Sequence, residues 1–279
     1  MANATPASAV DTHYARGDIG AAILDALRAA GKNPNAPTSD DLAPVDQFHI
    51  GGKAATMDLA RLANVRPGQT LLDVGGGLGG PARTMAQEFG CTVIVADLTA
   101  EYCRVGALLT ERTRLAEHVA FVHANALDLP FADAAFDLVW TQHSSMNIEA
   151  KDRLYAELHR VVRSGGRFAL HEVMTGRRFP VRFPVPWATD QTLSYLCTPA
   201  AVRELLRHTG FVELAWADAT ESTLTTIMAP PRSGAVDTAR SPLGLHLLLG
   251  DACGTMMQNL VCNLAEGRLA IVRGVLERR

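Results

Sequence analysis

Residues 70–83 read Thr-Leu-Leu-Asp-Val-Gly-Gly-Gly-Leu-Gly-Gly-Pro-Ala-Arg, and this stretch decides the fold. The apolar run at 70–74 predicts a short buried strand, because parallel strands that are covered on both faces read as near-continuous apolar residues. The glycines at 75–80 predict a tight turn, and Pro81 favours the first turn of a helix over 81–89. The stretch therefore predicts a strand, a glycine-rich turn and a helix.

The same alternation continues along the chain. Strand-like runs and helical patterns follow one another at 92–96, 100–116, 119–123, 136–140, 149–163 and 166–173. Strands that alternate with helices predict an α/β fold with a doubly wound, mostly parallel sheet. After a proline-rich connection come a helix at 199–208, a strand at 211–218, helical stretches at 220–228 and 243–265, and a last strand at 269–275. This ending suggests that the sheet closes with an edge hairpin.

The N-terminal residues lie outside the alternating pattern. Residues 19–30 have apolar side chains at helical spacing, and a segment rich in proline and asparagine follows them. We therefore predict an N-terminal helical cap at 1–65 and a sheet domain at 66–279. A helical insertion at about 219–267 is expected before the last strand.

The composition excludes several classes of protein. Of 279 residues, 48% are hydrophobic and 20% charged, which is typical of globular proteins and not of disordered ones. The net charge of -3, without a block of like charges, disfavours a nucleic-acid partner. No stretch is long and apolar enough for a membrane span, and residues 1–6 lack the order of a signal peptide, so we expect a cytoplasmic protein. The 5 cysteines form no C-x-x-C pair, so neither disulfides nor a metal site is expected.

The glycine-rich turn points to a nucleotide. Its spacing satisfies G-x-G-x-x-G between a predicted strand and a predicted helix, where glycines let backbone N–H groups approach a ligand closely. Such a turn accompanies dinucleotides and also S-adenosylmethionine, so the turn alone leaves the ligand open. Asp73 comes shortly before the first glycine. A carboxylate there would repel a pyrophosphate but suit an ammonium or sulfonium group, and it therefore favours the cationic ligand.

Polar residues also follow the next two strands. Asp97 comes directly after the strand at 92–96, where a carboxylate can accept hydrogen bonds from both hydroxyls of a ribose. The same residue could instead stabilise the N-terminus of the following helix. Asn125 and Ala126 follow the strand at 119–123, where a side chain and a backbone N–H could read an adenine edge. Asparagine is also a common turn residue, so both interpretations stay open.

Several segments resemble a known family in sequence order. Residues 71–83, Asp97, residues 125–131 and 136–139, and Arg-Ser-Gly-Gly-Arg-Phe at 163–168 resemble the successive motifs of class I S-adenosylmethionine-dependent methyltransferases. Asp-Gln-Phe-His-Ile-Gly-Gly at 46–52 and Trp-Thr-Gln-His-Ser-Ser-Met-Asn at 140–147 are similar to its small-molecule branch, which contains sarcosine/dimethylglycine, phosphoethanolamine and tocopherol methyltransferases. The resemblance implies a Rossmann-like fold, S-adenosylmethionine as cofactor and S-adenosylhomocysteine as product. It also implies methyl transfer to a small molecule by in-line displacement.

The resemblance further implies roles for individual residues. The cofactor-binding residues would be Gly75 and Gly77 at the methionyl part, Asp97 with the adjacent Leu98 at the ribose, Asn125 and Ala126 at the adenine, and Phe48, His49 and Gln142 closing over the cofactor. The family usually has Asp at position 125, and its first loop often reads Gly-Cys-Gly or Gly-Thr-Gly where this chain has Gly-Gly-Gly. Both substitutions preserve hydrogen bonding or backbone access.

Two residues are candidates for the catalytic side. His143 comes just after the strand at 136–140, where a substrate would lie over the sheet, and could accept a proton or orient the nucleophile. Tyr14 resembles an N-terminal tyrosine that helps to bind substrate in the phosphoethanolamine branch. That branch pairs the tyrosine with a histidine, whereas Asn147 stands in its place here, so phosphoethanolamine is not the expected substrate. His171, Glu172, Tyr195 and His246 could also line the pocket.

Two other functions remain open at this stage. One is a nicotinamide-dependent oxidoreductase, which rests on the glycine spacing alone and which Asp73 disfavours. The other is a catalytically silent cofactor-binding protein that regulates a partner enzyme, because methyl displacement has no obligatory catalytic residue. A homodimer is compatible with the sequence. We interpret the apolar stripe of Met256, Met257, Leu260 and Leu264 as core.

Overall fold

The computed structural model describes residues 13–14, 18–228 and 241–279. The strands are β1 (Thr70–Val74), β2 (Thr92–Asp97), β3 (Val119–His123), β4 (Phe136–Gln142), β5 (Val162–Thr175), β6 (Phe211–Asp218) and β7 (Leu269–Arg278). The α-helices are α2 (Ile19–Ala29), α3 (Ser39–Asp46), α4 (Gly52–Leu62), α5 (Gly80–Phe89), α6 (Ala100–Arg112), α7 (Lys151–Val161), α8 (Pro199–Thr209), α9 (Thr220–Met228), α10 (His246–Leu249) and α11 (Cys253–Ala265). Short 3₁₀ turns lie at η1 (Ser145–Asn147), η2 (Gln191–Leu193) and η3 (Gly250–Ala252).

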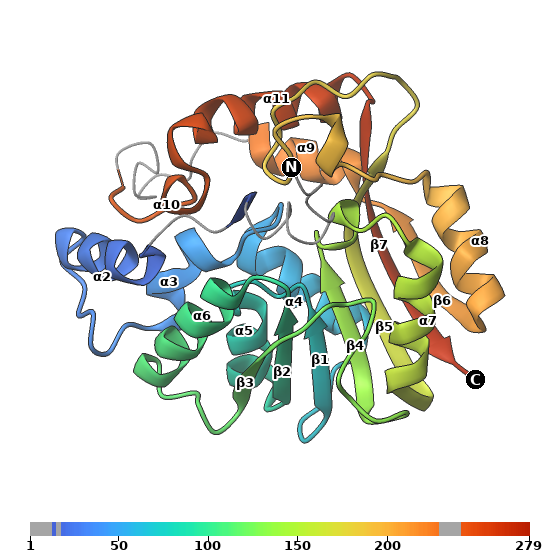
Figure 1. Cartoon of the computed structure of the whole chain (residues 1–279), viewed down its shortest axis with the longest axis horizontal. Helices are drawn as coiled ribbons and strands as arrows, with labels where there is room; N and C mark the ends of the chain where they lie inside the picture. The colour runs from blue at the N-terminus through green and yellow to red at the C-terminus, as the bar shows by residue number, and fades with distance from the viewer. Residues whose placement is uncertain (1–12, 15–17, 229–240) are drawn as a thin grey trace, which may run out of the picture.

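The strands form one seven-stranded sheet in the order β3-β2-β1-β4-β5-β7-β6 (Figure 1). Strands β1 to β5 pair in parallel, whereas β7 lies between β5 and β6 and is antiparallel to both. The predicted doubly wound, mostly parallel sheet and its edge hairpin are confirmed. The order reverses between β1 and β4, which is the place where open α/β sheets leave a crevice for a ligand.

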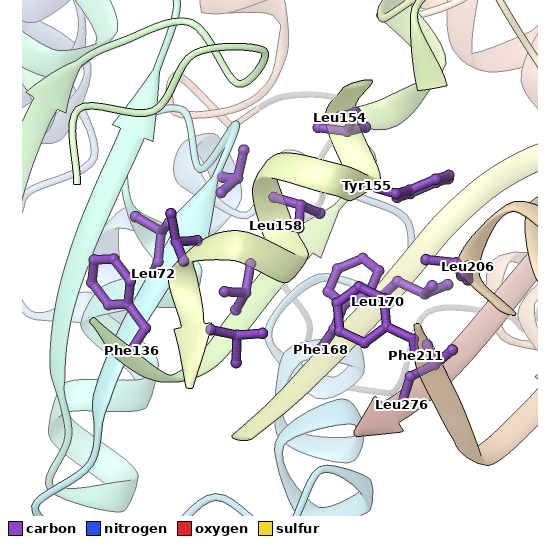
Figure 2. Packing of buried hydrophobic residues seen from close by; sticks show 14 of the residues in the cluster. Leu72, Phe136, Leu154, Tyr155, Leu158, Phe168, Leu170, Leu206, Phe211 and Leu276 are labelled. Carbon is purple, nitrogen blue, oxygen red and sulfur yellow. The ribbon is translucent and has the colours of Figure 1, made fainter. Parts of the chain in front are cut away.

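Each face of the sheet has its own apolar core because successive side chains of a strand point to opposite faces. Leu72 packs in a cluster with α7 and α8, in which Leu158, Phe168 and Leu206 are labelled (Figure 2). Leu71, the next residue on β1, packs in a second cluster with α4 and α5. Helices therefore cover both faces of the sheet. This explains why residues 70–74 are mostly apolar and do not alternate with polar residues.

Further apolar clusters hold the segments that lie outside the alternation. The first joins α2 and α3 to α6 and α10, and the second joins α9 and α11 to residues 181–188 and to the start of β7. The predicted helical insertion before the last strand is confirmed in α9, α10 and α11. Residues 1–12 and 15–17 of the predicted cap, and residues 229–240 of the predicted insertion, lie outside the described residues.

A buried ion pair joins α3 to the glycine-rich turn. Nη2 of Arg83 donates to Oδ2 of Asp46 at 2.7 Å and to the carbonyl of Leu78 at 2.8 Å, and Nη1 donates to Oγ1 of Thr110 at 2.7 Å. Both charged side chains are almost completely buried. The guanidinium thus connects α3, the turn, α5 and α6 at one point.

This ion pair generates a prediction on stability. Arg83→Leu would leave the Asp46 carboxylate buried without its partner, and we expect the free energy of unfolding to fall by about 3–5 kcal/mol. Arg207→Leu breaks an exposed pair with Glu204 and serves as the control, with a much smaller expected loss, because solvent screens exposed pairs. Urea unfolding measures both, and equal losses in the two variants would contradict a structural role for the buried pair.

Candidate functional site

A cavity of about 400 Å³ lies at the carboxyl ends of the parallel strands. Its walls include the residues that follow β1, β2, β3 and β4, together with residues from α3, α10 and α11. All the site residues chosen from the sequence line it: Tyr14, Phe48, His49, Gly75, Gly77, Asp97, Leu98, Asn125, Ala126, Gln142 and His143. The structure therefore brings together positions that are widely spaced along the chain.

The glycine-rich turn forms the floor of the cavity. At two positions that line the cavity, its backbone conformation suits glycine and disfavours a residue with a side chain. Gly75 has a φ of 72° and Gly77 a φ of 56°, values that suit glycine and strain most other residues. A Cβ atom on Gly75 would lie 2.4 Å from Cβ of Ser144, which follows β4. The turns after β1 and β4 can pack this closely only when position 75 has no side chain.

Asp97 is held in place by backbone amides. Its Oδ2 accepts a hydrogen bond from the N–H of Gly77 at 2.9 Å, and its Oδ1 accepts one from the N–H of Thr99 at 2.9 Å. Burial raises the pKa of this carboxyl, and the two amide donors act in the opposite direction. The carboxylate therefore links the glycine turn to the end of β2, with Leu98 beside it on the cavity wall.

Two more carboxylates lie at the same wall. Oδ2 of Asp73 and Oδ1 of Asp46 are buried and have no hydrogen-bond partner among the described residues. Burial, and then the charge of Asp97, raises the pKa of Asp73 to about 8. Burial also raises the pKa of Asp46, although Arg83 opposes the shift. A positively charged group at this wall would therefore favour the ionised form of both carboxyl groups.

The residues after β3 form a turn at the cavity wall. Oδ1 of Asn125 accepts a hydrogen bond from the N–H of Leu127 at 2.9 Å, and the carbonyl of Asn125 accepts one from the N–H of Asp128 at 2.9 Å. The asparagine is thus a turn residue and also lines the cavity with Ala126. The two interpretations of Asn125 made from the sequence are compatible.

A buried polar network holds Gln142 and His49. Oε1 of Gln142 accepts hydrogen bonds from Nε1 of Trp140 at 2.9 Å and from Oγ1 of Thr56 at 3.1 Å. Nε2 of His49 lies 3.0 Å from the carbonyl of Gly52, which makes it the protonated nitrogen. Burial is the largest cause that lowers the pKa of His49, to about 4. Both side chains are therefore uncharged and fixed before any ligand binds.

Tyr14 connects the N-terminal segment to η1. Its hydroxyl donates to Oδ1 of Asn147 at 3.0 Å, and Nδ2 of Asn147 donates to the carbonyls of Trp187 and Leu193 at 2.8 and 2.9 Å. The asparagine that replaces the family's histidine is thus the partner of the tyrosine. Burial raises the pKa of Tyr14 well above its usual range, so the side chain is a neutral phenol. The ring of Phe48 lies edge-on to it, with centroids 6.4 Å apart.

His143 has a defined tautomer. Its Nδ1 accepts a hydrogen bond from the N–H of Ile50 at 3.2 Å, so the ring proton lies on Nε2, which has no partner among the described residues. Burial, and then the neighbouring His49, lowers the pKa of His143 well below 6.5. The ring of His171 lies 4.8 Å away, centroid to centroid. His143 is thus a neutral imidazole whose free nitrogen is a donor.

The remaining wall of the cavity is apolar, and sequence reasoning missed most of it. Met257 and Leu260 belong to the stripe interpreted as core, yet both line the cavity, although Leu260 is also buried. The other apolar side chains here come from distant segments: Ile50, Met146, Val173, Pro186, Trp187, Leu245 and Leu248. An apolar stripe on a helix does not reveal whether it faces a core or a cavity. His171, Glu172, Tyr195 and His246 do not line it.

Comparison with known proteins matches part of the chain to one family model. Residues 72–170 match the model of the family described as "Methyltransferase domain". The sarcosine/dimethylglycine N-methyltransferase of Halorhodospira halochloris is 32% identical over 154 residues, 55% of this chain and 55% of that protein. Methyltransferase GfsG of Streptomyces halstedii is 29% identical over 199 residues, 70% of this chain and 69% of that protein. The chain thus spans between about half and about two thirds of these relatives.

Solved structures share the fold over almost the whole chain. The geranyl diphosphate C-methyltransferase of Streptomyces coelicolor A3(2), in complex with Mg²⁺, geranyl-S-thiolodiphosphate and S-adenosyl-L-homocysteine, has a TM-score of 0.68 at 18% identity, and the match covers 100% of both chains. The [4+2]-cyclase SpnF has a TM-score of 0.67 at 21% identity, covering 99% of this chain and 97% of that one. The Rossmann-like fold expected from the sequence is confirmed.

The raised pKa of Asp73 predicts how stability depends on pH. The folded protein holds this proton up to about pH 8, whereas the usual pKa of the carboxyl is 3.8. The contribution of the protonated carboxyl to the free energy of unfolding is therefore lost as the pH rises from the usual pKa to the pKa in the folded protein. Asp73→Asn mimics the protonated form, so the stability of the native sequence relative to this variant should fall over that range in urea titrations.

Asp137→Asn is the control for this experiment. Burial raises the pKa of Asp137. The amide of Thr70 and the guanidinium of Arg163 together lower it by more, so the pKa of this carboxyl lies below its usual value. The stability that this carboxylate contributes is present above its usual pKa of 3.8 and is lost only at lower pH. The relative stability of Asp137→Asn should stay flat where that of Asp73→Asn changes. Parallel curves would show that Asp73 has an ordinary pKa.

The geometry of His143 predicts a ring that stays neutral. Nitrogen-15 spectra should show a protonated Nε2 and an unprotonated Nδ1, with no change between about pH 8 and about pH 6. The signals can be assigned with His143→Asn, because the φ of 52° at this position suits asparagine. A titration within that range, or a proton on Nδ1, would overturn the assignment.

Proposed function

We propose that the chain is an S-adenosylmethionine-dependent methyltransferase, which binds S-adenosylmethionine in this cavity and transfers a methyl group to a small molecule. The methyltransferase match of residues 72–170 and the similarity to two methyltransferases support this proposal. One observation carries the proposal. The glycine turn, the fixed Asp97 and the Asn125 turn line a single cavity where the strand order reverses. A ligand that joins a nucleoside to an amino acid would contact the glycine turn, Asp97 and the Asn125 turn one after another along its length.

The residues present fit this cofactor by charge. S-adenosylmethionine carries a sulfonium and an ammonium group, and the cavity wall has two buried carboxyl oxygens, Oδ2 of Asp73 and Oδ1 of Asp46, without a hydrogen-bond partner among the described residues. A cation there lowers the cost of ionising Asp46 and Asp73. We propose that the following residues hold the cofactor: Phe48, His49, Gly75, Gly77, Asp97, Leu98, Asn125, Ala126 and Gln142.

When bound, the cofactor supplies an electrophilic methyl group, whose bond to sulfur breaks as its bond to the acceptor forms, leaving S-adenosylhomocysteine. The chain contributes positioning, which can supply roughly 7–11 kcal/mol toward such a displacement. We propose that Tyr14 and His143 belong to the wall that positions the acceptor. Since Nδ1 of His143 already accepts the Ile50 amide, the exchangeable position is the Nε2 donor. This supports a role in orienting the acceptor over one in removing its proton.

The alternatives receive less support. A nicotinamide dinucleotide would place its pyrophosphate at the glycine turn, beside the carboxylate of Asp97, where like charges repel. The family model and the two relatives described above are all methyltransferases, and none of them is an oxidoreductase. A catalytically silent cofactor-binding protein would bind S-adenosylmethionine without turnover, and a methyl-transfer assay separates it from an enzyme.

Three further features are proposals. We propose that residues 1–65 act as a cap that limits water access to the cavity, supported by Tyr14, Phe48 and His49 on its wall. A cytoplasmic location and a homodimer are proposed as well, and light scattering measures the second. Within the described residues, no helix is long and apolar enough to cross a membrane.

Calorimetry tests the proposed cofactor. The protein should bind S-adenosylmethionine and S-adenosylhomocysteine but not NAD. Asp97→Ala should weaken binding about 10- to 150-fold, because it removes charge-assisted hydrogen bonds worth roughly 1.5–3 kcal/mol. Asp25→Ala, at an exposed surface position, should leave the affinity unchanged. Tight NAD binding, or an Asp97→Ala variant that binds like the native protein, would refute the proposal.

A further inference from the structure

The two sides of the cavity differ in chemistry. The floor, at the strand ends, has backbone amides and the carboxylates of Asp46, Asp73 and Asp97. The opposite wall is built from segments of the late insertion, and α10 and α11 lie above the edge of the sheet where β1 and β4 end (Figure 1). Its side chains are apolar, and those that come from this insertion are Leu245, Leu248, Met257 and Leu260. We refer to these four residues as the roof.

An anionic acceptor would lack a counter-ion beneath this roof. Among the residues that the structure describes, no lysine or arginine lines the cavity. Two buried cations nearby are already satisfied: Arg83 pairs with Asp46, and Nζ of Lys151 donates to the carbonyls of Ser145 and Tyr195 at 2.8 and 2.7 Å. An anion would also be repelled by the carboxylate of Asp97 on the floor. Placing a net charge in an apolar site without a partner is costly.

Neutral polar side chains lie along the same cavity. Gln142, His143, Ser144 and Asn147 follow one another at or just after the end of β4 and line the wall. His143 is uncharged because burial lowers its pKa well below 6.5. The amide of Asn147 is occupied by the carbonyls of Trp187 and Leu193. We call these four residues the neutral belt, which suits a hydroxyl, carbonyl or similar group better than an anion. Glu149, which follows the belt on the wall, adds a carboxylate.

We propose that the methyl acceptor is a mainly apolar molecule without an anionic group, which lies beneath the roof and turns a single polar end to the neutral belt. The inference rests on the proposed function, because it assigns the floor to the cofactor. Apolar contact then supplies most of the binding energy, in proportion to the surface removed from water. The belt selects the orientation in which the polar end faces the floor.

A matched pair of fluorescent probes tests the proposal. N-phenyl-1-naphthylamine and 1-anilinonaphthalene-8-sulfonate share one ring system and differ by a sulfonate. Both are titrated into the full chain in the presence of saturating S-adenosylhomocysteine. We expect the uncharged probe to bind at least about tenfold more tightly than the anion, because the roof offers apolar surface without a counter-ion. No binding of the uncharged probe, or an equal or stronger affinity for the anion, would overturn the proposal.

A change of charge in the roof locates the binding site. Met257 is half-buried, so Met257→Lys should place an ammonium in the cavity and reduce the preference for the uncharged probe by about tenfold. Leu214→Lys adds the same charge at an exposed position on β6 and should leave the preference unchanged. Equal responses of the two variants would show that the probes bind elsewhere, and this would also overturn the proposal.

The design separates this inference from the proposed function. The proposed function fails if the protein binds no S-adenosylhomocysteine, which calorimetry measures without any probe. The inference fails if cofactor binding is intact and the probes show no preference for the uncharged form. Repeating the titration without S-adenosylhomocysteine shows how much of the preference comes from the roof, because the floor carboxylates then also face the probe.

Discussion

The buried pair of Arg83 and Asp46 is the interaction on which the site depends. A buried guanidinium is tolerated only when its donors are satisfied, and here they reach α3, the glycine turn and α6 at once. The pair therefore fixes the N-terminal helices relative to the floor of the cavity. It also leaves one oxygen of Asp46 beside Gly80 without a partner among the described residues.

The sheet explains why the floor can be both open and rigid. β1 pairs with β2 on one side and β4 on the other, so the turns after β1 and β4 lie next to each other. Gly75 lets them approach, and Asp97 at the end of β2 holds the N–H of Gly77. Each turn starts from a strand buried between two layers of helices, which leaves its backbone little freedom to move. Preorganised donors and acceptors follow from this packing.

The floor was predictable from the sequence because it depends on local spacing. Gly75, Asp97 and Asn125 each follow a strand at a short distance, and the parallel sheet then brings the strand ends together. The contacts of the N-terminal segment were not predictable in this way. Tyr14 and Asn147 are 133 residues apart, and nothing local in either segment specifies their hydrogen bond. The tautomer of His143 depends likewise on the amide of Ile50, 93 residues away.

The roof shows a different limit, which also explains its role. The stripe that contains Met257 and Leu260 satisfies the pattern of a core helix, and part of it is core, since Leu264 packs against Leu269 and Ile271 of β7. The packing of Leu264 at one end of this stripe holds Met257 and Leu260, nearer its other end, against the cavity. A floor built from strand ends and a roof built from a separate insertion can therefore vary independently. Substitutions in the roof change the shape and charge offered to an acceptor without disturbing the contacts of Asp97 and the glycine turn.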